Sequence, residues 1–332
     1  MNIRTKLVSA ALSLLVAASG ACAAEQTKLR ISKQYGLGYL PLVVLEGRKL
    51  LEKNAKEAGL GDLAVEWITF AGGVPANDAL LAGNVDLISG GVAPAVILWD
   101  KTQGAARILA ALNESPLVLN TSNPNVKTLR DLTENDRIAL PSVKVSIQAI
   151  TLSIAAVKEF GPKEFARFDP LTVALPHPDA LIALTSGKSE ITGHFTSEPF
   201  ITLEQRNPNV RQVLSSYDLF GRHTNNIVTT SKKFYDANPK LVSVIIKSLN
   251  EANEWIAANK NEAARLYLEV SKSREPIELI KAILDKSENT FSTKPLNLTV
   301  YSDFLHEIGR IKKKPTERDL FFPKIFEQGN GG

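Results

Sequence analysis

The stretch that decides the fold is VEWITFAGGVPANDALLAGNVDLISGG, residues 65–91. It begins with a run typical of a β-strand at 65–70, and a loop that contains Gly72-Gly73 leads from this strand into a helix. Gly83 ends the helix, and a second short strand follows at 85–89. Strand, loop, helix and strand in this order predict one α/β unit.

The same alternation continues outward in both directions. Upstream, a strand at 28–32 precedes a glycine-containing loop and a helix over 42–58. Downstream, a helix over 94–104 precedes an apolar strand at 107–112, as expected of a strand that is buried on both faces. We therefore predict a mainly parallel α/β sheet.

A second alternating block follows the polar segment 113–116. Its predicted elements are strands at 117–119, 137–140, 171–174 and 190–194 and helices at 126–132, 146–160 and 179–185. After an irregular polar stretch at 215–224, a strand is predicted at 226–230, and the remaining chain is helical in character. We expect this tail to close the molecule without adding a sheet. Two successive blocks, each too long to be a loop, predict a two-domain α/β protein.

The first 23 residues have the three parts of an export signal. Arg4 and Lys6 give a positive start, 7–18 is apolar and uncharged, and Ala21-Cys22-Ala23 is a small-x-small cleavage site. The apolar run is shorter than the about 20 residues that a transmembrane helix needs. We therefore expect cleavage near Ala23 and an exported protein. The small residues before Cys22 leave a lipid anchor as the alternative, although the usual bulky aliphatic residue three positions earlier is missing.

The composition excludes several classes of function. Cys22 is the only cysteine, so cleavage after Ala23 leaves a chain of about three hundred residues that depends on its hydrophobic core. Loss of Arg4 and Lys6 lowers the formal net charge from +4 to +2, which argues against a nucleic-acid partner. The four histidines lack metal-ligand spacing, and no nucleophile elbow occurs. We expect no metal, no cofactor and no catalytic residue.

Four stretches, in their order and spacing, carry a resemblance to one family. They are 79–87, 126–132 followed by 137–141, 196–200 (Thr-Ser-Glu-Pro-Phe) and 234–258. These stretches resemble four features of the ABC-importer solute-binding proteins for taurine, alkanesulfonates and nitrate. The features are the gly-x-x-asp segment, the start of the second domain, the trp-glu-pro corner and the helix after the return crossover.

The resemblance implies a two-lobed periplasmic binding protein of class II type, with two chain crossovers and a ligand cleft between the lobes. The crossovers would fall near 113–117 and 216–227, which gives lobe one as 24–114 with 226–332 and lobe two as 115–225.

The implied function is that of a monomeric periplasmic receptor without enzymatic activity. It would capture a sulfonate, a nitrate-like anion or a small heterocycle and deliver it to the membrane permease of an ABC importer. Two alternatives are a thiamine-pyrimidine-related enzyme on the same fold, which the export signal disfavours, and a ligand sensor without an importer.

The candidate ligand-binding residues follow from the rule that ligands of parallel α/β sheets bind beyond the carboxyl ends of the strands. They are Gln34, Tyr35, Tyr39, Phe70, Gly72, Gly73, Gly91, Val92, Asn113, Ser142, Ser146, Gln148, His194, Thr196 and Glu198. Paired glycines at two strand ends either let backbone amides approach an anion, beside helix N-termini that favour negative charge, or simply make tight turns. The three aromatic residues either enclose a ligand or belong to the core.

Five of these candidates have a more specific interpretation. Ser146 and Gln148 resemble the serine or threonine and the polar residue that relatives carry at this helix start, and Ser142 and Ser146 are each able to cap the helix instead. His194 either contacts the ligand or makes a structural hydrogen bond. Glu198 either binds a ligand amine or favours the start of its helix. The segment Val143-Lys144-Val145 replaces the glycine-rich approach of the relatives.

Overall fold

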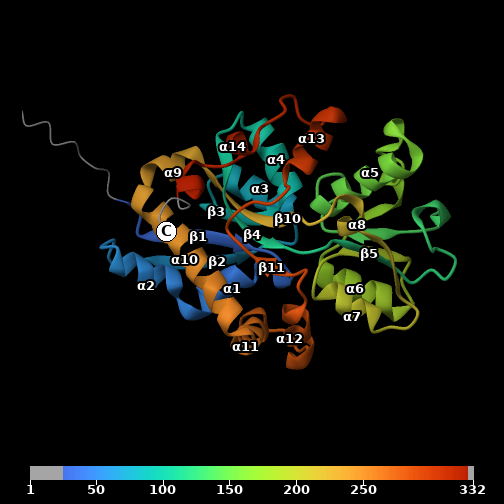
Figure 1. The fold of residues 1–332 in the computed structure, drawn as a ribbon, viewed down its shortest axis with the longest axis horizontal. Helices are drawn as coiled ribbons and strands as arrows, with labels where there is room; N and C mark the ends of the chain where they lie inside the picture. Colours follow the sequence, from blue (N-terminus) through green and yellow to red (C-terminus); the bar gives the residue numbers. More distant parts are fainter. Residues whose placement is uncertain (1–24, 328–332) are drawn as a thin grey trace, which may run out of the picture.

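The computed structural model describes residues 25–327, and the expected export signal with Cys22 lies outside these residues. The fold has two lobes, each built around its own sheet (Figure 1). The first sheet has six strands in the order β11-β4-β10-β3-β1-β2, and the second has five in the order β7-β6-β8-β5-β9. The predicted two-lobed α/β architecture is therefore present.

The first lobe begins with the alternating units that the sequence predicts. Its strands are β1 (Lys28–Lys33), β2 (Ala64–Thr69), β3 (Leu87–Gly91), β4 (Ala106–Glu114), β10 (Thr224–Ser231) and β11 (Thr290–Phe291). Its early helices are η1 (Leu37–Tyr39), α1 (Leu40–Arg48), α2 (Leu50–Glu57), α3 (Gly73–Leu81) and α4 (Val92–Lys101). The single helix predicted over 42–58 is wrong. Lys49 adopts a left-handed backbone with φ 51° and breaks it, so that α1 packs against both α10 and α11 while α2 packs against α10.

The second lobe is smaller. Its strands are β5 (Val118–Thr121), β6 (Ile138–Leu140), β7 (Thr172–Ala174), β8 (Gly193–Thr196) and β9 (Arg211–Ser215). Its helices are η2 (Leu129–Asp131), α5 (Ile147–Phe160), η3 (Pro162–Glu164), η4 (Asp169–Leu171), α6 (His177–Ser186), α7 (Phe200–Gln205) and α8 (Ser216–Phe220). The helix predicted over 126–132 is wrong, because Thr128 and Asp131 cap a single 3-10 turn and Leu132 is already extended.

The prediction of a mainly parallel sheet is wrong for the strands that follow the crossovers. β10 runs antiparallel to β3 and β4, and β5 runs antiparallel to β8 and β9. Strands within the alternating units run toward the cleft, and their pairs β1–β2, β1–β3, β6–β7 and β6–β8 are parallel. A strand that arrives from the other lobe starts at the cleft and runs away from it, which reverses its direction.

The C-terminal segment surrounds the first lobe (Figure 1). Its helices are α9 (Lys232–Ala237), α10 (Pro239–Ala258), α11 (Lys260–Ser271), α12 (Ile277–Asp285), α13 (Thr299–Glu307), α14 (Glu317–Leu320) and α15 (Lys324–Glu327). The tail adds no separate sheet, as expected, but β11 extends the first sheet by pairing with β4. Near the end of the chain, Phe321 is fully buried and forms a β-bridge with Ile108.

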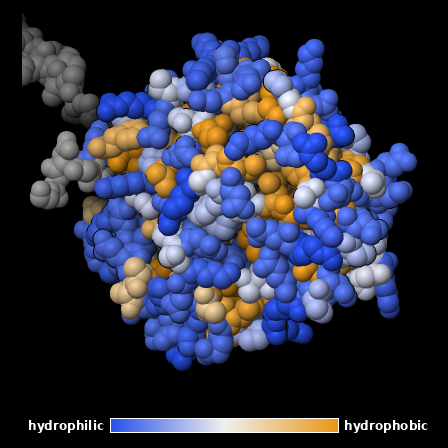
Figure 2. Space-filling model, turned by 45° about the vertical axis from the view of Figure 1, so that its right-hand side comes forward, coloured by the Kyte–Doolittle hydropathy of each residue, from blue (hydrophilic) through white to orange (hydrophobic). Residues whose placement is uncertain are grey.

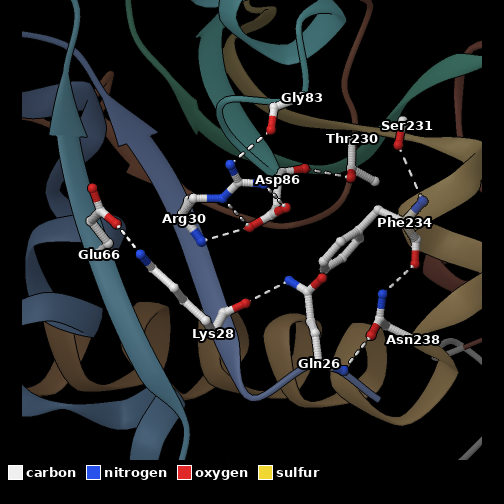
Figure 3. A network of polar contacts seen from close by, with 10 residues as sticks. All are labelled: Gln26, Lys28, Arg30, Glu66, Gly83, Asp86, Thr230, Ser231, Phe234 and Asn238. Carbon is white, nitrogen blue, oxygen red and sulfur yellow. Dashed lines mark hydrogen bonds and ion pairs between the residues drawn. The ribbon is translucent and has the colours of Figure 1, made fainter. Parts of the chain in front are cut away.

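Asp86, in the segment 65–91, takes part in hydrogen bonds that connect β1, the turn at Gly83 and β10 of the first lobe (Figure 3). Its carboxylate accepts hydrogen bonds from Arg30 Nε at 3.1 Å and Nη2 at 2.8 Å, which joins it to β1. Arg30 Nη1 also donates to the carbonyl of Gly83 at 2.7 Å, and Thr230 of β10 donates to the carbonyl of Asp86 at 2.7 Å. The gly-x-x-asp segment therefore stabilises the lobe and does not face the cleft.

The surface shown in Figure 2 is mainly hydrophilic, with hydrophobic residues in separate patches. Within residues 25–327, no helix combines the length and the apolarity that crossing a bilayer requires. Three of the six exposed large hydrophobic residues, Tyr35, Val74 and Val143, lie in loops or helix starts that follow strand ends.

Phe321→Ala is expected to lower the free energy of unfolding by about 3–5 kcal/mol, because the ring is fully buried beside β4 and its removal leaves a cavity. Urea denaturation measures the change. Leu296→Ala is the control, since this side chain of the same tail is 39% exposed, and its effect should stay within about 0.5 kcal/mol. A similarly small effect of Phe321→Ala would show that the tail is not part of the folded core.

Candidate functional site

A pocket lies where the two lobes meet. It is lined by Gln34, Tyr35, Tyr39, Gly73, Gly91, Pro94, Pro141, Ser146, Ile147, Gln148, His177, Ser197, Asn225 and Asn226. The volume open to the centre of a water molecule is about 20 Å³, enough for roughly one water. Beside this pocket the lobes touch, since the backbone N–H of Leu37 donates to the carbonyl of Glu198 at 2.8 Å, so the lobes are closed in this structure.

The structure brings about half of the candidate residues to this pocket. The candidates in the lining are Gln34, Tyr35, Tyr39, Gly73, Gly91, Ser146 and Gln148. The candidates outside the lining are Phe70, Gly72, Val92, Asn113, Ser142, His194, Thr196 and Glu198. Phe70 packs against a small apolar cluster that includes Leu80, and Val92 is fully buried in the core.

Four helices begin at the pocket. Gly73 is the first residue of α3, Gly91 is the N-cap of α4, and His177 is the first residue of α6. Ser146 is the N-cap of α5, where its hydroxyl oxygen accepts from the backbone N–H of Ala149 at 3.2 Å and its own O–H is left to donate. Helix N-termini favour negative charge. The lining contains no Lys, Arg, Asp or Glu, so the pocket offers an anion only neutral groups and helix ends.

Two candidate glycines allow the lobes to touch. A Cβ atom on Gly91 would lie 2.7 Å from Cβ and Cγ2 of Ile147, and one on Gly72 would lie 2.8 Å from Ser142 Oγ and 2.9 Å from the carbonyl oxygen of Pro141. Both glycines belong to the first lobe and their neighbours to the second. Close approach of the lobes therefore requires a glycine at position 72, and it also places Ser142 against the opposite lobe.

Glu198 links the lobes at a second place, outside the pocket lining. Its backbone carbonyl accepts from the N–H of Leu37 at 2.8 Å, and its carboxylate accepts from Lys286 Nζ, beyond α12, at 2.7 Å. The same carboxylate accepts from the backbone N–H of Thr202 at 3.2 Å and from its hydroxyl at 2.8 Å. Glu198 thus both supports the first turn of α7 and pairs with a cation of the other lobe.

The wall beside the crossovers is a set of amides and hydroxyls. Tyr39 donates its O–H to Asn226 Oδ1 at 3.0 Å, and burial raises the pKa of Tyr39, which keeps this proton in place. Asn226 donates through Nδ2 to Asn113 Oδ1 at 3.1 Å, and Asn113 Nδ2 donates to Ser115 Oγ at 3.0 Å. Asn113 therefore lies behind the lining and orients Asn226. Asn225 and Asn226 did not follow from the strand-end rule, because they begin β10 instead of ending a strand.

The histidine that lines the pocket is His177, not the predicted His194. His194 is fully buried on β8, and its Nε2 lies 2.8 Å from Nδ1 of His177. On the other side, His194 Nδ1 contacts Oε1 of Glu204, whose Oε2 accepts from Asn120 Nδ2 at 2.8 Å. The ring of His177 also stacks on Phe200, with centroids 5.3 Å apart. His177 follows the strand predicted at 171–174, so its loop was an available but overlooked candidate.

Thr196 belongs to the same buried group. Its hydroxyl lies 3.2 Å from Nδ1 of His177, and Thr196 is not in the pocket lining. Gln148, which also lines the pocket, approaches the opposite nitrogen of His177, with its Nε2 3.4 Å from the ring Nε2. Thr196 therefore supports a lining residue without belonging to the lining itself.

Burial governs the protonation of this group. It lowers the pKa of His194 to about 3, and burial together with the neighbouring His194 lowers the pKa of His177 well below 6.5. Burial also raises the pKa of Glu204 to about 8, with a smaller contribution from the negative Glu198, against the opposing hydrogen bond from Asn120. Burial therefore favours the protonated form of the Glu204 carboxyl.

The comparison with protein families identifies the chain. Residues 22–270 match the model of the NMT1-like family. The chain belongs to the NMT1-like family. A comparison with curated proteins gave no match. The described part of this NMT1-like protein contains no cluster of three or more His, Cys, Asp and Glu side chains placed to hold a metal ion.

Several solved structures share the fold of this NMT1-like protein. The alkanesulfonate-binding protein from Xanthomonas axonopodis pv. citri is 19% identical, with 90% of this chain and 99% of that chain covered and a TM-score of 0.67. The periplasmic aliphatic sulphonate binding protein from Escherichia coli is 20% identical over 92% and 100%, with a TM-score of 0.66. The periplasmic nitrate-binding protein from Synechocystis PCC 6803 is 15% identical over 92% and 89%, with a TM-score of 0.66. The predicted resemblance and the two-lobed periplasmic-binding-protein fold are confirmed.

Gly91→Ala is expected to hold the lobes apart, because its Cβ would overlap Ile147 although the backbone, with φ −67°, tolerates alanine. Small-angle X-ray scattering should give a larger radius of gyration for the variant than for the wild type in the same buffer. Gly193→Ala is the control, since its added methyl meets second-lobe atoms at ordinary distances of 3.4 to 3.6 Å. Equal radii for Gly91→Ala and wild type would contradict the role of Gly91 in closure.

Proposed function

We propose that this protein is the exported, periplasmic solute-binding component of an ABC importer and that it has no enzymatic activity. It captures a small molecule between its lobes and presents the closed form to a membrane permease. The observation that carries this proposal is a pocket at the plane of lobe contact, lined by side chains from both lobes. Solved structures with the same fold include sulfonate-binding and nitrate-binding proteins, and this supports the proposal.

The mechanism is ligand-stabilised closure. Gln34 and Tyr35 reach the pocket from the first lobe, and Gln148, His177 and Ser197 reach it from the second. A ligand that contacts both sets binds the closed form better than the open form and shifts the population toward closure. In this proposal lobe one is 24–114 with 226–332, lobe two is 115–225, and the hinge lies at the two crossovers.

We infer that an organic anion, with a sulfonate first, is the ligand class that fits best. Four helix N-termini and neutral donors suit an anionic head, while the exposed Tyr35 of the lining offers apolar surface for an organic tail. A nitrate-like anion would use the helix ends but leave that apolar surface without a partner. A small heterocycle remains the alternative, since the lining amides also match its ring nitrogens and oxygens.

A thermal-shift screen of the chain without residues 1–23 tests the proposed function. Its panel is alkyl- and arylsulfonates including taurine, nitrate, pyrimidines and aromatic acids. We expect a sulfonate to raise the melting temperature, because a ligand at 100 times its Kd stabilises the folded state by about 2.7 kcal/mol. Turnover of a panel compound, with no compound stabilising the protein, would contradict the binding-protein function.

Tyr35→Ala is expected to weaken binding of the best stabilising compound about tenfold, or about 1.4 kcal/mol, because Tyr35 lines the pocket and its ring is removed from the ligand. The ring is 42% exposed, so the free energy of unfolding should change by less than about 0.5 kcal/mol. Isothermal titration calorimetry measures the affinity. Ile182→Ala, on α6 and 65% exposed, is the control with wild-type affinity. Unchanged affinity of Tyr35→Ala would place the ligand elsewhere.

A further inference from the structure

A continuous buried chain of titratable groups runs from the pocket into the second lobe. It starts at His177 in the lining, continues through His194 and ends at Glu204, which Asn120 holds in place. His177 and His194 are 6% and 0% exposed, and Glu204 is fully buried. Closure of the lobes does not by itself require such a chain. Its geometry nevertheless constrains which hydrogen-bonding group the pocket presents.

Each contact along this chain holds one hydrogen. When Glu204 is ionised, its carboxylate accepts from Nδ1–H of His194, so Nε2 of His194 has a lone pair and accepts from Nδ1–H of His177. A neutral imidazole carries only one N–H. Nε2 of His177 then has a lone pair, and the pocket meets a hydrogen-bond acceptor.

Adding one proton to the group His177, His194 and Glu204 turns the acceptor that the pocket meets into a donor. If the proton stays on Glu204, its O–H donates to Nδ1 of His194, Nε2–H of His194 donates to Nδ1 of His177, and His177 carries its hydrogen on Nε2. If the proton moves onto either imidazole, Nε2 of His177 again carries a hydrogen. Every arrangement with the extra proton therefore presents a donor to the pocket.

We propose that Glu204, acting through His194, determines whether His177 presents a hydrogen-bond donor or an acceptor, so that the cleft binds an oxyanion only with one proton on this chain. The inference rests on the proposed binding function and adds a determinant of its specificity. His194 and Glu204 are positioning residues, and only His177 touches the ligand. An oxyanion needs donors, and with His177 in its acceptor form two lone pairs would face each other.

The residues around His177 are compatible with both its donor form and its acceptor form. Gln148, the pocket-side neighbour of His177, has both a donor and an acceptor on its amide and adapts to either form. The charged groups that face the chain are Glu198 at the start of α7 and, paired with it, Lys286 beyond α12. Asp179 of α6 and Arg206 after α7 are exposed. The raised pKa of Glu204, about 8, places the loss of the proton just above neutral pH.

Nitrogen-15 spectra of histidine-labelled protein without added ligand test the switch directly, because they identify the protonated nitrogen of each ring. From pH 5 to 10, we expect His177 and His194 to exchange tautomers together at a single midpoint near pH 8. His306→Gln, which removes an exposed histidine, assists the assignment. Fixed tautomers throughout, or separate midpoints for the two rings, would overturn the proposal whether or not a ligand is known.

Glu204→Gln is expected to hold the hydrogen-bonded group His177, His194 and Glu204 in one arrangement of its hydrogens. The glutamine carbonyl can accept from Asn120 while its amide donates to Nδ1 of His194, which keeps the hydrogen on Nε2 of both rings. We expect the donor tautomer of His177 at every pH in this variant. Glu190→Gln makes the same change of charge at an exposed residue of the same lobe and should keep the wild-type switch. A pH-dependent switch that persists in Glu204→Gln would assign it to another group.

Binding of ethanesulfonate, measured by calorimetry between pH 6 and 10, tests the consequence for the ligand. We expect the affinity of the wild type to fall about tenfold per pH unit above about pH 8, because binding requires one proton on this group. The affinity of Glu204→Gln should fall far less over the same range. Identical pH profiles for the two proteins would overturn the coupling. If ethanesulfonate binds neither protein at pH 6, the proposed ligand class fails, and the spectra still decide the switch.

Discussion

The site is shaped by the approach of the two lobes at two glycines of the first lobe. Gly91 and Gly72 bring two helix starts of the first lobe against Ile147 and Ser142 of the second with no room for a Cβ atom. This contact places the N-termini of α3, α4 and α5 around one small space. A pocket without a charged side chain thereby acquires an electrostatic preference for anions.

The parts of the sequence that carry the family resemblance mainly build the lobes. Asp86 of the gly-x-x-asp segment binds Arg30 within the first sheet, and Glu198 of the corner motif pairs with Lys286 between lobes. Neither lines the pocket. These two residues of the resemblance therefore serve the fold, whereas His177 and Asn226 line the pocket.

Hydrophobic alternation was sufficient to predict two α/β lobes, and its failures have local physical causes. The pattern over 42–58 is continuous, yet the left-handed backbone of Lys49 splits the helix into α1, which packs against α10 and α11, and α2, which packs against α10. The direction of β10 depends on its arrival from the other lobe, which no local pattern records. The same reversal explains why Asn225 and Asn226 were missed, since the amino end of β10 lies at the cleft. His194 lies on β8, the strand that the prediction named, but its side chain is fully buried in the second lobe. His177, which contacts His194, lines the pocket instead.

In the proposed function, one small molecule holds both lobes together at this pocket. Hydrogen–deuterium exchange with and without the most strongly stabilising compound measures whether it does. We expect simultaneous protection of segments from both lobes, around Gln34 to Tyr39 and Gly91 in the first and around Ser146 to Gln148 and His177 in the second. Protection confined to one lobe, or to the surface between α2 and α10, would contradict it.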